Sequence, residues 1–191
     1  MRLRLTALAL AAAALAGCGS GGPTIPKSKL SGLVLRQSDL PGGFAAFYIG
    51  KQLRADQTPR RSDPQRFGRE GGWIARFHRG GSPRTRGPLV VASRADLFKG
   101  SGGARKDLQL YQGDLQSGVG KQVEVPKLGD ETIAAVSVQP GPTSVRTYLI
   151  AWRRDNATAE LDANGFGKRI TLADVLALAR KQDARLRRAA G

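Results

Sequence analysis

The chain of 191 residues has a single cysteine, Cys18, and a single histidine, His78. One thiol cannot form a disulfide within the chain, so no internal disulfide stabilises the fold. One histidine cannot supply the paired imidazoles of a metal site, and a Ser-His-Asp arrangement would have to use His78. Because His78 lies inside an alternating segment, we interpret it as a half-exposed strand residue. We predict no metal site and no catalytic residue.

Motifs of the common catalytic and nucleotide sites are missing as well. No G-x-S-x-G turn occurs, and the glycine-rich stretch 100–103 lacks the Gly-Lys-Ser/Thr ending of a phosphate-binding loop. The neighbouring acids Asp130 and Glu131 point to opposite sides of an extended segment, which is unsuitable for shared acid–base chemistry. We therefore predict no cofactor and a protein that is not an enzyme.

Acidic residues are scarce relative to basic ones. The 15 aspartates and glutamates face 31 lysines and arginines, which leaves a net charge of +16. Such a balance favours anionic partners: phospholipid head groups, acidic envelope polymers or nucleic acid. The composition of an arginine-, alanine- and glycine-rich sequence explains part of the charge equally well, and both interpretations stay open.

The positive charge is densest between Lys51 and Arg86. Ten basic residues there face three acidic ones, a net of +7. Long polar loops in compact domains are either functional or disordered. We predict a basic surface in this segment that meets anionic groups, formed by Arg60, Arg61, Arg66 and Arg69.

Long apolar runs are absent except at the N-terminus. The run Leu5–Ala16 is shorter than the about 20 residues that a membrane-spanning helix needs. It follows two arginines and ends in small residues, as in a secretory signal peptide. The segment Leu15–Cys18 reads Leu-Ala-Gly-Cys and resembles the lipobox of bacterial lipoproteins. The resemblance implies cleavage before Cys18 and a diacylglyceryl group on its thiol, which would also explain the lone cysteine.

Three regions follow from this interpretation: a signal peptide over 1–17, a lipidated cysteine with a glycine- and proline-rich tether over 18–29, and a single domain over 30–191. Two acyl chains anchor a protein stably, whereas one gives only marginal binding. We expect a lipid-anchored protein on the extracytoplasmic side of the cell membrane. Export argues against nucleic acid as its partner.

Hydrophobic periodicity in the domain predicts alternating strands and two amphipathic helices. Phe44–Ile49 is expected to be a short edge strand or an irregular segment. Val145–Arg153 is apolar on both faces, which indicates a central strand covered on both sides. Asn164-Gly165 is predicted to be the turn that ends the last strand. The predicted strands are 72–79, 89–98, 132–138, 145–153 and 157–163, and the helices are 101–116 and one that begins at Thr171.

The last helix carries a Thr171/Asp174 capping box and a buried face made of Leu172, Val175, Leu176, Ala179 and Leu186. The fold class is therefore α+β: a mostly antiparallel sheet of five to six strands with two main helices, in the order strand-strand-helix-strand-strand-strand-helix.

A set of short motifs adds a resemblance to this prediction. The motifs are D-L-P-G-G-F at 39–44, F-K-G-S-G-G-A-R at 98–105, L-G-D-E-T at 128–132, A-W-R-R-D-N at 151–156 and L-A-R-K-Q-D-A-R-L at 178–186. Together they resemble small lipoproteins of unknown function from high-GC bacteria, and the element order is similar to PsbP-like α/β domains. The resemblance implies a fold and a ligand- or partner-binding role. It implies no catalytic residue.

One weak anion site is also predicted. A glycine-rich turn that enters a helix exposes backbone N–H groups at the positive end of the helix dipole. The residues concerned are Lys99, Ser101, Gly102, Gly103 and Arg105. Ordinary helix capping is the other interpretation of these residues. The sequence as a whole favours a non-catalytic binding module for a ligand, an envelope polymer, anionic lipid or a protein partner; an envelope enzyme with an unrecognised site is the alternative.

Overall fold

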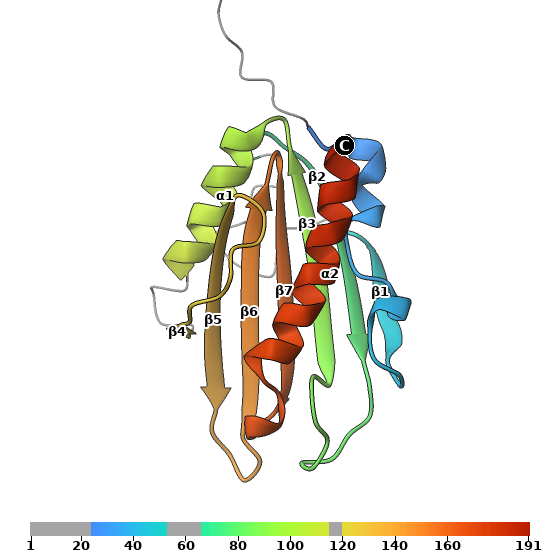
Figure 1. The fold of residues 1–191 in the computed structure, drawn as a ribbon, viewed down its shortest axis with the longest axis vertical. Helices are drawn as coiled ribbons and strands as arrows, with labels where there is room; N and C mark the ends of the chain where they lie inside the picture. The colour runs from blue at the N-terminus through green and yellow to red at the C-terminus, as the bar shows by residue number, and fades with distance from the viewer. Residues whose placement is uncertain (1–23, 53–65, 115–119) are drawn as a thin grey trace, which may run out of the picture.

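The computed structural model describes residues 24–52, 66–114 and 120–191. Within these ranges, seven strands form one sheet in the order β1-β2-β3-β7-β6-β5-β4, and neighbouring strands are antiparallel (Figure 1). The elements in chain order are η1 (Lys27–Gly32), η2 (Gln37–Asp39), β1 (Ala45–Lys51), η4 (Arg66–Gly68), β2 (Arg69–His78), β3 (Val90–Phe98), α1 (Ser101–Asp114), β4 (Lys121–Gln122), β5 (Glu131–Gln139), β6 (Val145–Arg154), β7 (Ala157–Phe166), η6 (Gly167–Arg169) and α2 (Leu172–Ala190).

The two α-helices cover opposite faces of the sheet. Side chains alternate along β6, so Leu149 and Ala151 point to one face and Ile150 and Trp152 to the other. Ala151 and Leu149 pack with Leu108 of α1. Ile150 and Trp152 belong to the main core, which also holds the apolar face of α2. The prediction of a central strand covered on both sides is confirmed.

Helix α2 forms because its start is capped and one face is apolar. The backbone N–H of Asp174 donates to Oγ1 of Thr171 at 3.2 Å, and the N–H of Thr171 donates to Oδ2 of Asp174 at 2.9 Å. These two bonds satisfy donors that the first helical turn leaves unpaired. Figure 1 shows α2 in front of the sheet. Of the predicted face, Val175, Leu176, Ala179 and Leu186 are buried and Leu172 is half-buried.

The sheet has more strands than predicted. The fold class, antiparallel α+β with two main helices, is confirmed, but β1 and the two-residue β4 raise the strand number to seven within the described residues. The segment Phe44–Ile49 was predicted to be either an edge strand or irregular, and it forms most of the edge strand β1. Local periodicity cannot decide such a case, because pairing with β2 fixes the strand.

The predicted turn at Asn164-Gly165 is wrong. Both residues lie inside β7, where Asn164 pairs with Val90 of β3 and Thr147 of β6. A Cβ on Gly165 would lie 2.8 Å from the carbonyl oxygen of Gly87, so the glycine permits a close backbone approach. The glycine at this position therefore allows two backbone segments to pack closely and does not form a turn.

The folded region begins before residue 30. Ile25 is buried in the main core, and η1 starts at Lys27. The described fold therefore includes residues that the prediction assigned to the tether over 18–29. No helix in the described part of the chain is long and apolar enough to cross a membrane.

Candidate functional site

The side chain of Asn156 fastens the start of the described N-terminal segment to the sheet. The N–H of Ile25 donates to Oδ1 of Asn156 at 2.8 Å. Nδ2 of Asn156 donates to the carbonyl oxygens of Phe98 at 2.9 Å and Ile25 at 3.2 Å. Asn156 is buried in the turn between β6 and β7. The chain from Cys18 therefore reaches the fold at this end of the sheet.

A hollow of about 210 Å³ lies at this end, between η1 and the last turns of α2. Figure 1 shows η1 beside the C-terminal end of α2. We call this cavity the basic hollow; its lining is Lys29, Gly32, Leu33, Arg36, Arg185, Arg188 and Ala189. Four of these side chains are cationic and none is acidic. Such a lining attracts anions, and guanidinium groups bind phosphate or carboxylate in a bidentate way.

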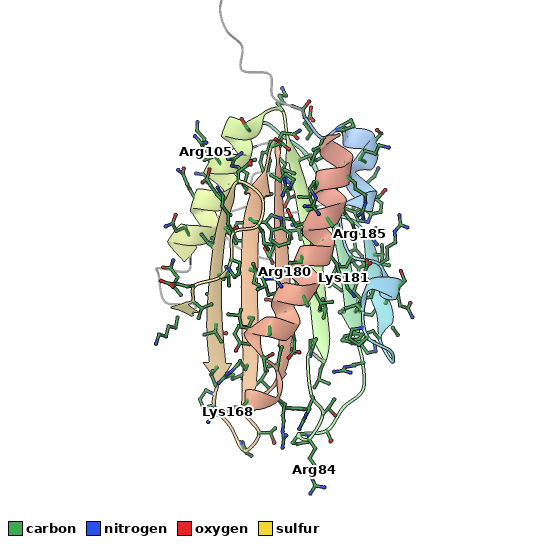
Figure 2. All side chains as sticks on the ribbon, in the orientation of Figure 1. Arg84, Arg105, Lys168, Arg180, Lys181 and Arg185 are labelled. Carbon is green, nitrogen blue, oxygen red and sulfur yellow. The ribbon has the colours of Figure 1, made fainter. Side chains whose placement is uncertain are left out.

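One cation of the basic hollow is held in place by an acid outside it. Nη2 of Arg185 donates to Oδ2 of Asp39 at 2.6 Å, and Lys181 donates to the carbonyl oxygen of Asp39. Figure 2 shows Arg185 and Lys181 along α2. Lys29 and Arg188 are exposed and form no ion pair with the described residues. The ion pair orients Arg185, while the unpaired cations keep their charge available.

A second hollow of about 350 Å³ lies on the other side of η1, against the ends of β1 and β2. We call it the Trp73 groove. It is lined by Lys27, Ser28, Leu30, Ser31, Lys51, Gln52, Glu70, Gly71, Gly72 and Trp73. Its volume is at the lower end of the range for small-molecule sites.

Charged side chains also form a row on the sheet face that carries α1. Glu160 and Asp162 are two residues apart on β7, so both side chains lie on this face. Nη1 of Arg94 on β3 lies 3.4 Å from Oε2 of Glu160. Burial, and secondly the charge of Glu160, raise the pKa of Asp162 to about 7, although Arg94 and Arg76 oppose the shift. The alternation of Glu160 and Asp162 was visible in the sequence. Their position beside Arg94 depends on the β3–β7 pairing, which the sequence did not reveal.

The predicted anion site at the start of α1 is partly occupied by protein contacts. A Cβ on Gly103 would lie 2.3 Å from the carbonyl oxygen of Phe67, so η4 covers that side of the first turn. Nε of Arg105 donates to Oε1 of Glu131 at 3.1 Å. The exposed Lys99 donates its backbone N–H to Gly68. Ser101 and Gly102 are exposed in this turn.

Of the four arginines predicted to form a basic surface, two lie in the described residues, and these two make different contacts. Arg60 and Arg61, like Cys18, lie outside the described residues. The exposed Arg66 stacks its guanidinium 4.8 Å from the ring centroid of Phe67. Nε of Arg69 donates to the buried Asp96 at 2.7 Å, and only 12% of the Arg69 side chain is exposed. Arg69 is therefore committed to an internal ion pair.

The described residues include His78, and they do not meet the requirements of a metal site. His78 is exposed at the end of β2, with its ring centroid 5.3 Å from that of Phe47. No group of three His, Cys, Asp or Glu side chains suited to a metal ion occurs in the ranges that the structure describes.

Comparison with known proteins gives a similarity to a solved structure. No protein-family model matches the chain, and no curated protein matches it. The fold is similar to the extracellular domain of PknH from Mycobacterium tuberculosis, with a TM-score of 0.50 and 16% sequence identity. The alignment covers 87% of this chain and 100% of the PknH domain. At this identity the similarity concerns the fold alone.

Proposed function

We propose that the protein is a lipid-anchored extracytoplasmic binding module that contacts an anionic membrane surface through the basic hollow. The observation that carries the proposal is a hollow with four cationic side chains and no acidic one, at the end of the sheet where the N-terminal segment joins. The fold similarity to an extracellular domain and the lipobox resemblance support the location.

The distance from the expected anchor favours this surface over others. Six residues lie between Cys18 and the fastened Ile25, so a fully extended connection of seven residue steps spans roughly 25 Å. The helix η1, which contributes Lys29 to the basic hollow, begins two residues later. A bilayer that held Cys18 would therefore lie close to the basic hollow.

The expected energy suits a domain that is already anchored. A basic residue near an anionic surface contributes about 1 kcal/mol. The exposed Lys29, Arg36 and Arg188 would together contribute roughly 3 kcal/mol on this scale. That is weak for a freely diffusing protein. For a tethered one it is sufficient, because the tether gives a high effective concentration at the surface.

Liposome partition of the mature chain carrying Cys18→Ala tests the surface. We expect binding to phosphatidylglycerol vesicles and none to phosphatidylcholine vesicles. Arg36→Gln with Arg188→Gln should weaken partition roughly thirty-fold, since two contacts of about 1 kcal/mol are lost. The matched control is Arg84→Gln with Lys168→Gln, which removes the same charge at the opposite end of the molecule (Figure 2). Equal losses in both double variants would show that only net charge matters.

Metabolic labelling tests the anchor separately. A palmitate analogue should label the full chain in its bacterial host, and Cys18→Ala should abolish the label because no other cysteine exists. Equal labelling of both chains would overturn the lipoprotein assignment, and the partition experiment would remain informative.

The alternative, an envelope enzyme, is favoured by the Glu160–Asp162 pair. A carboxyl group with a pKa near 7 beside a second carboxylate is a feature of acid–base catalysts. The ion pair of Glu160 with Arg94 also has a purely structural explanation. An activity on envelope material that Asp162→Asn abolishes, with lipid partition unchanged, would favour the enzyme.

A further inference from the structure

We propose that the Trp73 groove is a binding site for a small acidic carbohydrate, a sugar ring that carries one carboxylate or phosphate group. The inference rests on the composition of this groove and does not depend on lipid contact by the basic hollow. The two cavities lie on opposite sides of η1 and share no lining residue.

Backbone pairing between β1 and β2 forms the frame of the groove. The N–H of Gln52 donates to the carbonyl oxygen of Gly72 at 2.9 Å, which continues the β1–β2 pairing one residue beyond β1. The register shifts between Arg69 and Gly71, so Glu70 is an extra residue in β2. Such bulges redirect side chains and are frequent beside functional sites. Glu70 lines the groove from this position.

One of the residues that line the groove, Gln52, has an acceptor without a donor. Oε1 of Gln52 is buried and has no hydrogen-bond partner among the described residues. A buried unpaired carbonyl destabilises a protein unless some group donates to it. Gln52 and the carboxylate of Glu70 both line the cavity. Glu70, which is exposed, would accept hydrogen bonds from the hydroxyl groups of a ligand, and Gln52 would do so once its amide turns toward the cavity.

The remaining lining residues indicate two further features of the ligand, an anionic substituent and an apolar ring face. Lys27 and Lys51 are exposed at the groove and exceed its single acid, Glu70, by one charge. Their ammonium groups suit an anionic substituent. Trp73 is half-buried and packs on the core, so its indole is a fixed apolar wall. A sugar ring offers an apolar C–H face to such a wall and hydroxyls to the acceptors.

The tryptophans make occupancy directly measurable. The chain has two, and Trp152 is 0% exposed beneath α2. A change in emission on adding a ligand therefore reports on Trp73. The mature chain with Cys18→Ala is titrated with glucuronate, glucose 6-phosphate, glucose and inorganic phosphate. We expect saturable responses to the first two, at least tenfold tighter than to glucose, and none to inorganic phosphate.

Variants assign the response to the groove. Calorimetry should show at least fivefold weaker binding for Lys51→Gln, for Gln52→Leu and for Trp73→Phe, and no change for the distant Lys168→Gln. The stronger of glucuronate and glucose 6-phosphate identifies the anionic group. Liposome partition should be the same in Gln52→Leu and the parent chain, which separates this site from the basic hollow.

Several results would overturn the proposal. If glucose bound equally well, the anionic group would not contribute to binding. If inorganic phosphate bound equally well, the lysines would bind a simple anion and the sugar ring would not be recognised. Millimolar glucuronate and glucose 6-phosphate without effect, or binding that none of the three groove variants weakens, would show that no acidic sugar is bound here.

Discussion

At the scale of single residues, Asp162 makes the stability of this fold depend on pH. Its pKa rises from 3.8 to about 7 in the folded chain, chiefly because of burial and secondly because of Glu160. Arg94 and Arg76 face it with opposing charge. Between these two values the folded state binds a proton that the unfolded state releases, so the free energy of unfolding falls as pH increases.

We predict that Asp162→Asn removes this contribution. The variant should gain stability relative to the parent chain as pH rises from about 4 to about 7, and the difference should level off above that. Each unit of pKa shift corresponds to about 1.4 kcal/mol. Urea unfolding of both chains across this range measures the difference, and the titration of groups that do not interact with Asp162 cancels. Parallel profiles would mean that the carboxyl group is solvated.

Asn156 joins the N-terminal segment to the sheet at Ile25, and its replacement should loosen the segment there. Asn156→Ala removes three hydrogen bonds, to the N–H and carbonyl oxygen of Ile25 and to the carbonyl oxygen of Phe98. Leaving such buried groups unpaired costs about 1–3 kcal/mol each at most. Hydrogen exchange should accelerate strongly at the Ile25 amide and only slightly at Ile150. Equal acceleration at both would indicate global destabilisation instead.

At the scale of elements, hydrophobic periodicity correctly predicted the helices and strands whose buried faces can be recognised from neighbouring residues in the sequence. The double covering of β6 and the capped α2 were correct because apolar spacing and a Thr171/Asp174 pair are local features. The basic hollow could not be predicted in this way. Its Lys29 and Arg36 precede β1, whereas Arg185 and Arg188 end the chain, and only packing of η1 against α2 unites them.

Helix α2 should contribute strongly to stability through its buried face. Leu176 is 8% exposed and belongs to the main core. Leu176→Ala should cost about 2–5 kcal/mol, as truncation of a buried leucine usually does. Ile49→Ala on the edge strand β1 is the comparison, because that side chain is 54% exposed and should cost far less. A denaturant midpoint for Leu176→Ala within the range of Ile49→Ala would show that α2 is peripheral.

At the scale of the whole molecule, the two ends of the sheet have different surroundings. The N-terminal segment, the end of α2 and both cavities lie toward one end. Figure 2 shows Arg84 and Lys168 toward the other. Positive charge is therefore present at both ends, and net charge alone does not orient the domain. The lipid anchor and the basic hollow would act at the same end, so their effects on orientation add.

This arrangement predicts a fixed orientation at the membrane. In the lipidated chain the only native thiol would be blocked, so Ser31→Cys on η1 or Lys168→Cys each creates one site for a fluorescent dye. Strands of ten residues, such as β6, are roughly 33 Å long at about 3.3 Å per residue. On phosphatidylglycerol vesicles with an acceptor in the bilayer, energy transfer should be strong from position 31 and weak from position 168.

Salt should reduce that contrast without releasing the protein. The Debye length falls from about 8 Å at physiological ionic strength to about 3 Å at 1 M, which screens the cations of the basic hollow, whereas the acyl chains are unaffected. The domain would then tumble on its tether, and transfer from the two positions would converge. The Arg36→Gln/Arg188→Gln chain should show the same convergence at low salt. Contrast that persists in both conditions would mean that something other than charge, such as a direct protein partner, orients the domain.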